Sequence, residues 1–257
     1  MYQQISGPTG FSSAISLSSQ ELARIRYFIH ERWLERIKSV APECANQFKD
    51  IGIDQYHSLS HLVDQNDLWT REVRILSSDA ADEIRKMEFF GKLENSFGTI
   101  IIPDITNAGH EEFIWRIQKP NEIFSIQPIH ADQWFWELEK YDLDLLLKSK
   151  CDKLGLGAPK DLIRIKFWVG IYMEPGLSGL LYIPGSHLKE WVYGSEIKKG
   201  RFKSIFDPIK NKADDPILLL SEPGKAFVFH DKLLHGGALN KGENTRVSLE
   251  FTMFVKP

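Results

Sequence analysis

Residues 162–173, LIRIKFWVGIYM, decide the fold because apolar and polar side chains alternate along them. Side chains of an extended strand point alternately to its two faces, so this pattern predicts a strand with one apolar face. That face carries Ile163, Ile165, Phe167, Val169 and Ile171. The opposite face carries Arg164, Lys166, Trp168 and Tyr172. We predict that the apolar face packs against helices and that the polar face points into the interior of a barrel.

Residues 246–255 divide in the same way, with Arg246, Ser248, Glu250 and Thr252 on one face and apolar side chains on the other. Further strands are predicted at 99–102, 113–117, 123–129, 179–183, 217–220 and 226–229. Short strands at this density, separated by Gly and Pro turns, are typical of a β-sandwich or barrel.

The first third of the chain is predicted to be helical. Ser18 followed by Glu21 forms the capping-box pattern, and apolar residues then recur at helical spacing as far as Val40, before Pro42. A second helix is predicted from Ser78 or Asp79 to about Leu93. We therefore expect one domain over residues 1–257 that is mainly β, an antiparallel jelly roll. Its core covers about 98–257, and helices within about 1–97 pack on one sheet.

Composition argues against several classes of function. A net charge of −3 without a basic patch disfavours nucleic acid, and no run of about 18 apolar residues predicts a transmembrane segment. The two cysteines, Cys44 and Cys151, form neither a disulfide framework nor a zinc motif. The N-terminus lacks the pattern of a signal peptide, so we expect a cytoplasmic protein.

A metal site is predicted from His130-Ala131-Asp132 together with His235. Two residues at i and i+2 of a strand lie on one face, so His130 and Asp132 can bind one ion. Two imidazoles and one carboxylate form the facial triad of non-haem iron(II) oxygenases. His-x-Asp alone is more simply a hydrogen-bonded structural pair. The distal His235, followed by Gly236-Gly237 at which the backbone can turn away, favours the metal site.

A second, anionic ligand is predicted at Arg246, because a cation inside a barrel is costly unless it meets an anion. A guanidinium binds a carboxylate through two parallel hydrogen bonds, and Ser248 is close enough to add a third. A dicarboxylate such as 2-oxoglutarate would bind here by one end and reach the metal with its keto acid. The alternative is a structural ion pair between Arg246 and Glu250.

Four stretches, in this order, resemble the iron(II)/2-oxoglutarate oxygenases of the phytanoyl-CoA hydroxylase type. They are PIHADQWF at 128–135, FWVGIY at 167–172, YIPGSH at 182–187, and HGGALN at 235–240 leading to RVS at 246–248. The resemblance implies a double-stranded β-helix in which His130, Asp132 and His235 are the catalytic iron ligands. It also implies that Arg246 and Ser248 bind 2-oxoglutarate. Dioxygen is then the oxidant, succinate and CO2 are released, and ascorbate can serve as reductant. Because Asp132 is present, the resemblance favours hydroxylation over halogenation.

The substrate is predicted from the same resemblance to be small and polar. The N-terminal third and the segment between Asp132 and Trp168 differ from the phytanoyl-CoA enzymes. The chain is more similar to bacterial members that act on polar metabolites or cell-envelope sugars, including Kdo, the acidic sugar of lipopolysaccharide. The candidate substrate residues are Arg116, Lys166, Trp168, Tyr172 and Trp134. The alternatives for them are a solvated sheet face and simple core or lid packing.

The residue pattern leaves three other functions open. They are an acyl-CoA hydroxylase, a cupin-like metal enzyme that does not use 2-oxoglutarate, and a sugar-binding jelly roll without metal. Desaturation and ring closure also stay open beside hydroxylation, and no sequence feature predicts the oligomeric state.

Overall fold

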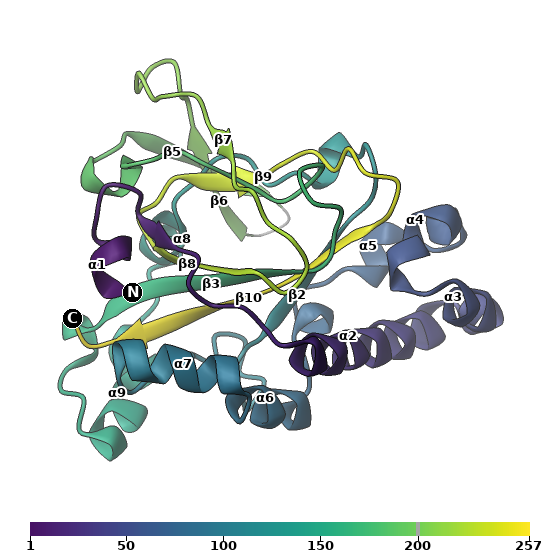
Figure 1. Ribbon diagram of the computed structural model, residues 1–257, viewed down its shortest axis with the longest axis horizontal. Helices are drawn as coiled ribbons and strands as arrows, with labels where there is room; N and C mark the ends of the chain where they lie inside the picture. Colours follow the sequence, from purple (N-terminus) through teal and green to yellow (C-terminus); the bar gives the residue numbers. More distant parts are fainter. Residues whose placement is uncertain (199–200) are drawn as a thin grey trace.

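Two antiparallel sheets, a separate two-stranded hairpin and a layer of helices make up the computed structural model, which describes residues 1–198 and 201–257 (Figure 1). The larger sheet has the strand order β1-β8-β3-β10-β2, and the smaller has the order β7-β4-β9. The strands of the larger sheet are β1 (Phe11–Ser12), β2 (Ile114–Gln118), β3 (Ile163–Tyr172), β8 (Ala226–His230) and β10 (Arg246–Val255). Those of the smaller are β4 (Leu180–Tyr182), β7 (Ile217–Leu218) and β9 (His235–Gly237).

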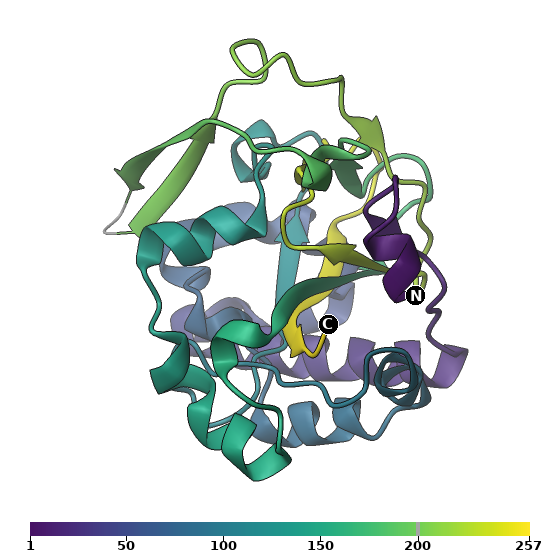
Figure 2. The same ribbon diagram turned by 90° about the vertical axis from the view of Figure 1, so that its left-hand side faces the viewer.

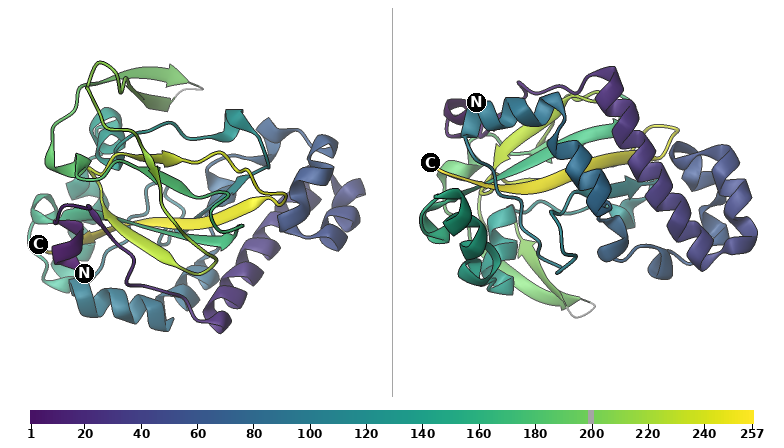
Figure 3. Two further views of the ribbon diagram at one scale, coloured as in Figure 1. Left: turned by 45° about the horizontal axis from the view of Figure 1, so that its top comes forward. Right: turned by 90° about the horizontal axis from the view of Figure 1, so that it is seen from below.

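Strands β3 and β10 form the middle of the larger sheet, and their apolar faces pack against the helices as predicted. Phe167 of β3 lies opposite Phe251 of β10, and the two rings stack with centroids 4.5 Å apart. Both are buried in one hydrophobic core with residues of the N-terminal helices, including Trp33 and Phe90. Figure 3 shows these helices crossing the outer face of the sheet.

The helices are α1 (Tyr2–Ile5), α2 (Ser19–Val40), α3 (Ala45–Ile51), α4 (Tyr56–Leu59), α5 (Gln65–Leu68), α6 (Ser78–Arg85), α7 (Glu88–Phe97), α8 (Asp132–Glu139) and α9 (Leu143–Leu154). Short 3-10 turns are η1 (Pro42–Cys44), η2 (Ile53–Gln55), η3 (Ser60–Leu62), η4 (Glu72–Arg74), η5 (Ile123–Ser125), η6 (Pro159–Asp161) and η7 (Ser186–Leu188). The capping box of α2 is confirmed, because the Ser18 side chain accepts from the backbone N–H of Glu21 and the Glu21 side chain accepts from that of Ser18. The helix also ends before Pro42, as predicted.

The predicted single helix over 78–93 is wrong, because the chain forms α6 and α7 with a break at Met87. Met87 has an extended backbone, with φ −70° and ψ 150°. Beyond the break, Phe89 and Phe90 at the start of α7 are both buried in the core, and burial of a large side chain stabilises by about 1.5–3 kcal/mol.

Two predicted strands are also wrong. Residues 99–102 form an isolated bridge, Ile101 to Phe254, although their side chains are buried as a strand pattern implies. Residues 123–129 begin with η5, in which the Phe124 side chain is fully exposed. Apolar content alone cannot distinguish a strand from a buried or exposed irregular segment, since a strand also needs a partner along its length.

The class prediction of a mainly β chain is partly correct. The antiparallel sheets and the helical layer on one sheet are as expected, but 39% of the residues are helical and 22% are in strands. Much of the unexpected helix lies beyond residue 97, in α8 and α9 between Asp132 and β3. The prediction placed the whole of 98–257 in the jelly-roll core.

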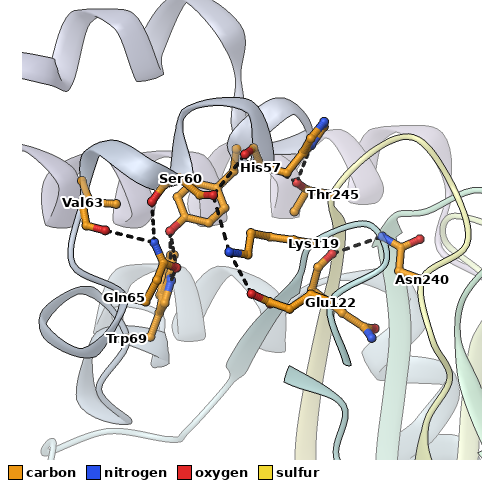
Figure 4. Close-up of polar contacts among 11 residues, drawn as sticks. His57, Ser60, Val63, Gln65, Trp69, Lys119, Glu122, Asn240 and Thr245 are labelled. Atoms are coloured by element: carbon orange, nitrogen blue, oxygen red, sulfur yellow. Dashed lines mark hydrogen bonds and ion pairs between the residues drawn. The ribbon is translucent and has the colours of Figure 1, made fainter. Parts of the chain in front are cut away.

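Polar contacts join the helical part to loops that follow β2 and precede β10 (Figure 4). The Lys119 ammonium lies 2.8 Å from Glu122 and 3.5 Å from the Ser60 hydroxyl. The backbone N–H of His57 donates to the Thr245 hydroxyl at 3.1 Å. Residues 119–122 and 245 are thus held against α4 and η3.

A separate hairpin, β5 (Tyr193–Lys198) with β6 (Arg201–Phe206), packs on α8 (Figure 2). Trp134 of α8 stacks on Tyr193, with ring centroids 4.5 Å apart and planes at 15°. Elsewhere, none of the described helices combines the length and the apolar character required to span a bilayer.

We expect Phe251→Ala to lower the free energy of unfolding by about 3–5 kcal/mol, because it leaves a cavity where Phe167, Phe90 and Phe113 meet. Urea denaturation measures this. Ile209→Ala, at an exposed position, is the control and should change the free energy by less than about 0.5 kcal/mol. Equal effects of the two substitutions would contradict the central place given to the β3–β10 pair.

Candidate metal centre and cosubstrate site

His130 and His235 come from distant parts of the chain and meet through their backbones. The N–H of His130 donates to the carbonyl of His235 at 2.8 Å, and the N–H of His235 donates back at 2.9 Å. Next to this bridge, a Cβ added at Gly236 would lie 2.9 Å from the Gln127 carbonyl oxygen. Gly236 therefore permits close approach of β9 to residues 127–129. The prediction that the backbone turns away at Gly236 is wrong, because Gly236 continues strand β9.

Asp132 is the first residue of α8 and does not share a strand with His130. The expectation that the two residues share a strand is therefore wrong, but the expected convergence of their side chains is still found. Ala131 between them has an extended backbone, with φ −108° and ψ 139°, so the two side chains still point to one side.

The two imidazoles present the same nitrogen to a common point. Nδ1 of His130 lies 2.9 Å from the Pro128 carbonyl oxygen, and Nδ1 of His235 lies 2.9 Å from that of Leu233. A proton on each Nδ1 satisfies these carbonyls and leaves Nε2 with its lone pair. Asp132 Oδ1 lies 3.6 Å from Nε2 of His130 and 3.9 Å from Nε2 of His235. One ligand atom from each residue lies within 4.8 Å of the other two, which is the spacing of a metal site.

The protonation of the site suits a divalent cation, which needs neutral imidazoles and an ionised carboxylate. Burial lowers the pKa of His235 to about 4, and the nearby His130 acts in the same direction. Burial would raise the pKa of Asp132, but Lys166 and both imidazoles together hold that pKa well below its ordinary range.

Gln127 is a residue of this site that the sequence analysis missed. Its side-chain amide lies 3.0 Å from Nε2 of His130, on the ligand nitrogen itself. Its position three residues before His130 was the available signal, but an isolated glutamine does not stand out in a sequence. Its amide is placed to contact whatever binds beside His130.

Arg246 and Ser248 lie on the inward face of β10, and several polar atoms around them lack partners. Arg246 donates through Nη1 to the Gly179 carbonyl at 2.8 Å. Among the described residues, Arg246 Nε and Ser248 Oγ are buried without a hydrogen-bond partner, as are Ser178 Oγ and Gln118 Oε1. Gln118 lies opposite Arg246 in the β2–β10 ladder, and Ser178 precedes Gly179. Buried polar atoms without partners are costly, so this cluster suits a ligand with several oxygens.

Arg246 does not form the ion pair with Glu250 that was the alternative. Within residues 1–198 and 201–257, Glu250 instead accepts from Arg116 Nε at 2.6 Å and lies 3.6 Å from the Lys166 ammonium. These two cations hold the pKa of Glu250 at about 2, although burial opposes them. Burial lowers the pKa of Arg246 to about 10, which still leaves the guanidinium charged at neutral pH.

Of the five predicted substrate residues, two lie beside the candidate metal centre and three do not. Lys166 and Arg116 lie beside the metal centre: Lys166 Nζ is 3.7 Å from Asp132 Oδ2, and Arg116 is linked to it through Glu250. Trp168 lies between the sheets, packed with Leu180 and Phe227, and is buried as core.

Tyr172 and Trp134 are placed elsewhere. The pairing of β3 with β10 shifts at Val247/Ser248, so Tyr172 lies opposite Val247 and packs on the helical side under Arg26. The prediction that Tyr172 shares the face of Lys166 is wrong, because a bulge changes which face the following residue occupies. Trp134 packs under the β5–β6 hairpin, which agrees with the alternative role in core or lid packing.

The donor set fits iron(II) and a dicarboxylate. Two imidazole nitrogens and one carboxylate oxygen could hold the ion with several positions left open, and a buried cation with unpartnered neighbours lies on the facing strand. Fold and site together define the class of non-haem iron(II) oxygenases.

Solved structures with this fold include ThoJ, a non-heme monooxygenase in its apo form, at 12% identity and a TM-score of 0.51. That comparison covers 96% of this chain and 75% of ThoJ. They also include SnoK, a non-heme alpha-ketoglutarate-dependent carbocyclase from nogalamycin biosynthesis, at 12% identity and a TM-score of 0.53. This comparison covers 96% of the chain and 80% of SnoK. The search of curated proteins found no match.

The chain belongs to the phytanoyl-CoA dioxygenase (PhyH) family, whose profile matches residues 22–248. The resemblance seen in the sequence is thereby confirmed. The protein is a non-haem dioxygenase of the iron(II)/2-oxoglutarate-dependent class.

We expect the metal-free protein to lose stability as the pH falls from about 6.5 to about 4, because folded His235 resists protonation until about 4 whereas the unfolded chain takes the proton near 6.5. Stability is fully present above this window. Urea unfolding at several pH values measures it. His235→Gln should show a shallower dependence, with the remainder from groups such as His187, whose pKa burial also lowers. An identical dependence in the variant would contradict this account.

Proposed function

We propose that this dioxygenase hydroxylates an aliphatic C–H bond of a small polar substrate that carries an anionic group. In the proposal His130, Asp132 and His235 bind iron(II), and Arg246 and Ser248 bind the far carboxylate of 2-oxoglutarate. When bound, iron(II) and 2-oxoglutarate supply the oxidising chemistry: with dioxygen, 2-oxoglutarate becomes succinate and CO2, and one oxygen atom enters the C–H bond of the substrate.

One observation carries the use of 2-oxoglutarate. A buried guanidinium, Arg246, lies on an inward strand face with its Nε and the neighbouring Ser248 hydroxyl unpartnered among the residues described. A buried unpaired cation costs several kcal/mol, which a carboxylate bound by two parallel hydrogen bonds offsets. A cupin-like metal enzyme or a metal-free sugar-binding protein would leave this arrangement without a use.

The chain's own residues then orient the reactants. The carbonyls of Pro128 and Leu233 fix both imidazole rings, so that each directs Nε2 at the ion. Gln127 is close enough to contact a group bound next to His130. Trp168 and Phe229, packed between the sheets, exclude water from the neighbouring side, where Phe229 contacts the ring of His235 at a centroid distance of 4.7 Å.

The substrate class is argued from charge. Iron(II) and the 2-oxoglutarate dianion cancel each other, and Asp132 and Glu250 offset two of the three cations Arg116, Lys166 and Arg246. One positive charge is therefore left over. Arg116 uses Nε for Glu250 while its side chain stays 33% exposed, the most accessible cation of this group. An acidic sugar fits this balance, and Kdo is the first candidate to test.

Two broader expectations accompany this proposal. We infer that residues 1–257 act as a single oxygenase domain, which the core shared by the helices and the larger sheet supports. We also infer a double-stranded β-helix, supported by the two facing antiparallel sheets. The cytoplasmic location stays a prediction.

Metal binding and turnover test the proposal directly. We expect the purified protein to bind iron(II) or cobalt(II) in titration calorimetry and to form succinate with iron, ascorbate, 2-oxoglutarate and Kdo. His130→Ala and Asp132→Ala should weaken metal binding by at least about 100-fold, because each removes one of three ligands. His61→Ala, at an exposed histidine, is the matched control and should bind metal as the wild type does.

The methyl ester of the same sugar separates the substrate class from the reaction class. Succinate formation with Kdo and not with its ester would support an anionic substrate, whereas equal rates would exclude it. A wild-type protein that binds no metal would exclude the oxygenase proposal as a whole.

Arg246→Ala should weaken 2-oxoglutarate binding to the metal-loaded protein by about 100-fold, since a charged bidentate contact is worth about 3 kcal/mol. Metal affinity should change little, because Arg246 is not a ligand. Calorimetric titration of cobalt(II) into the metal-free protein measures metal affinity, and titration of 2-oxoglutarate into the cobalt-loaded protein measures cosubstrate affinity. Arg26→Ala removes an arginine from the helical side of the same sheet and should leave 2-oxoglutarate binding unchanged. Unchanged cosubstrate affinity in Arg246→Ala would remove this residue from the site.

A further inference from the structure

The two oxygens of Asp132 have different surroundings. Oδ1 faces Nε2 of both imidazoles, at 3.6 and 3.9 Å. Oδ2 faces the Lys166 ammonium at 3.7 Å and, within the described chain, is buried without a hydrogen-bond partner. One oxygen is thus directed at the metal position, and the other toward a cation.

Lys166 is itself held in place from the opposite side. Its ammonium lies 3.6 Å from Glu250, which accepts from Arg116 at 2.6 Å. These residues stand on three adjacent strands of the larger sheet: β3, β10 and β2. The backbone pairing of β10 with β2 and β3 continues on both sides of these residues, so their positions are fixed by the sheet. The charges then alternate from Arg116 through Glu250 and Lys166 to Asp132.

We propose that Lys166 is a positioning residue that restricts Asp132 to a single metal-binding oxygen. This inference rests on the proposed function. A carboxylate can bind a cation through one oxygen or through both. A facial triad needs its remaining positions open, two for the keto acid of 2-oxoglutarate and one for dioxygen. The attraction of Lys166 for Oδ2 opposes rotation of that oxygen onto the metal. The coordination position that Oδ2 would otherwise occupy therefore stays available for 2-oxoglutarate or dioxygen.

The direction of the effect distinguishes this role from a general structural one. Lys166 is not a ligand, and its positive charge repels the metal ion. Its loss should therefore leave metal affinity equal or greater, while 2-oxoglutarate binds more weakly because it must displace the second oxygen. A residue that merely supported the fold would weaken both when removed.

The experiment compares Lys166→Met with the wild type by calorimetric titration of cobalt(II) into the metal-free protein, then of 2-oxoglutarate into the cobalt-loaded protein. We expect the dissociation constant of 2-oxoglutarate to rise about ten-fold, in the range seen for residues that orient metal ligands. That of cobalt should stay equal or fall. Lys166→Arg keeps the cation and should restore cosubstrate binding to near the wild-type value.

Arg164→Met is the matched control, since Arg164 lies two residues earlier on the same strand face in a partly buried ion pair with Asp231 at 2.7 Å. It should lower the urea midpoint without changing either dissociation constant. If Lys166→Met does not fold, Lys166→Gln is measured in its place. Lys166→Gln also removes the positive charge beside Oδ2 while keeping a polar side chain, so 2-oxoglutarate should again bind more weakly and cobalt equally or more tightly.

Weaker cobalt binding in Lys166→Met by the same factor as 2-oxoglutarate binding, or unchanged 2-oxoglutarate binding, would overturn the role of Lys166 and leave the proposed function standing. Failure of the wild type to bind cobalt or 2-oxoglutarate would overturn both.

Discussion

The antiparallel pairing of β3 with β10 is the constraint on which the rest of the structure depends. One face of this pair is wholly apolar and is covered by α2, α6 and α7, with Phe167 stacked on Phe251 at its centre. The opposite face carries Lys166, Ser248 and Glu250 into the interior between the sheets. Because side chains alternate strictly along a strand, burying the first face obliges the second to hold its charges inside. The cost of those buried charges is met by pairing them with each other and with ligands.

The metal centre is assembled from three kinds of local structure. His130 lies in an isolated bridge, His235 on a short strand of the smaller sheet, and Asp132 at the first position of α8. Carbonyl contacts orient both imidazoles, while the cation of Lys166 lies beside the free oxygen of Asp132. The larger sheet contributes no ligand but supplies the charges that surround the ligands. The candidate metal ligands and the proposed 2-oxoglutarate residues therefore come from different parts of the fold: the ligands from β9, the bridge at His130 and α8, and Arg246 and Ser248 from β10.

Much of the fold was predictable where a local pattern determined it. The capping box at Ser18, the alternation in β3 and β10 and the His-x-Asp motif each depend on neighbours in sequence. Predictions failed where long-range packing decided the outcome. The apolar spacing over 78–93 continues through Met87, where the chain breaks into two helices, and residues 123–129 formed no strand although their apolar content was suitable. Tyr172 changed face because of a register shift near Val247 that no periodicity in β3 announces.

The sequence by itself determined the types of candidate metal ligand, the cation on the last strand and the division of two strands into apolar and polar faces. These are properties of residue identity and spacing, and they do not require knowledge of partners. Tertiary structure alone decided which charges meet. Glu250 pairs with Arg116 and Lys166 and not with Arg246, because β2 and β3 lie on either side of β10. That choice leaves the Arg246 guanidinium without a carboxylate partner among the described residues, and it follows from strand order, which no single segment of the chain contains.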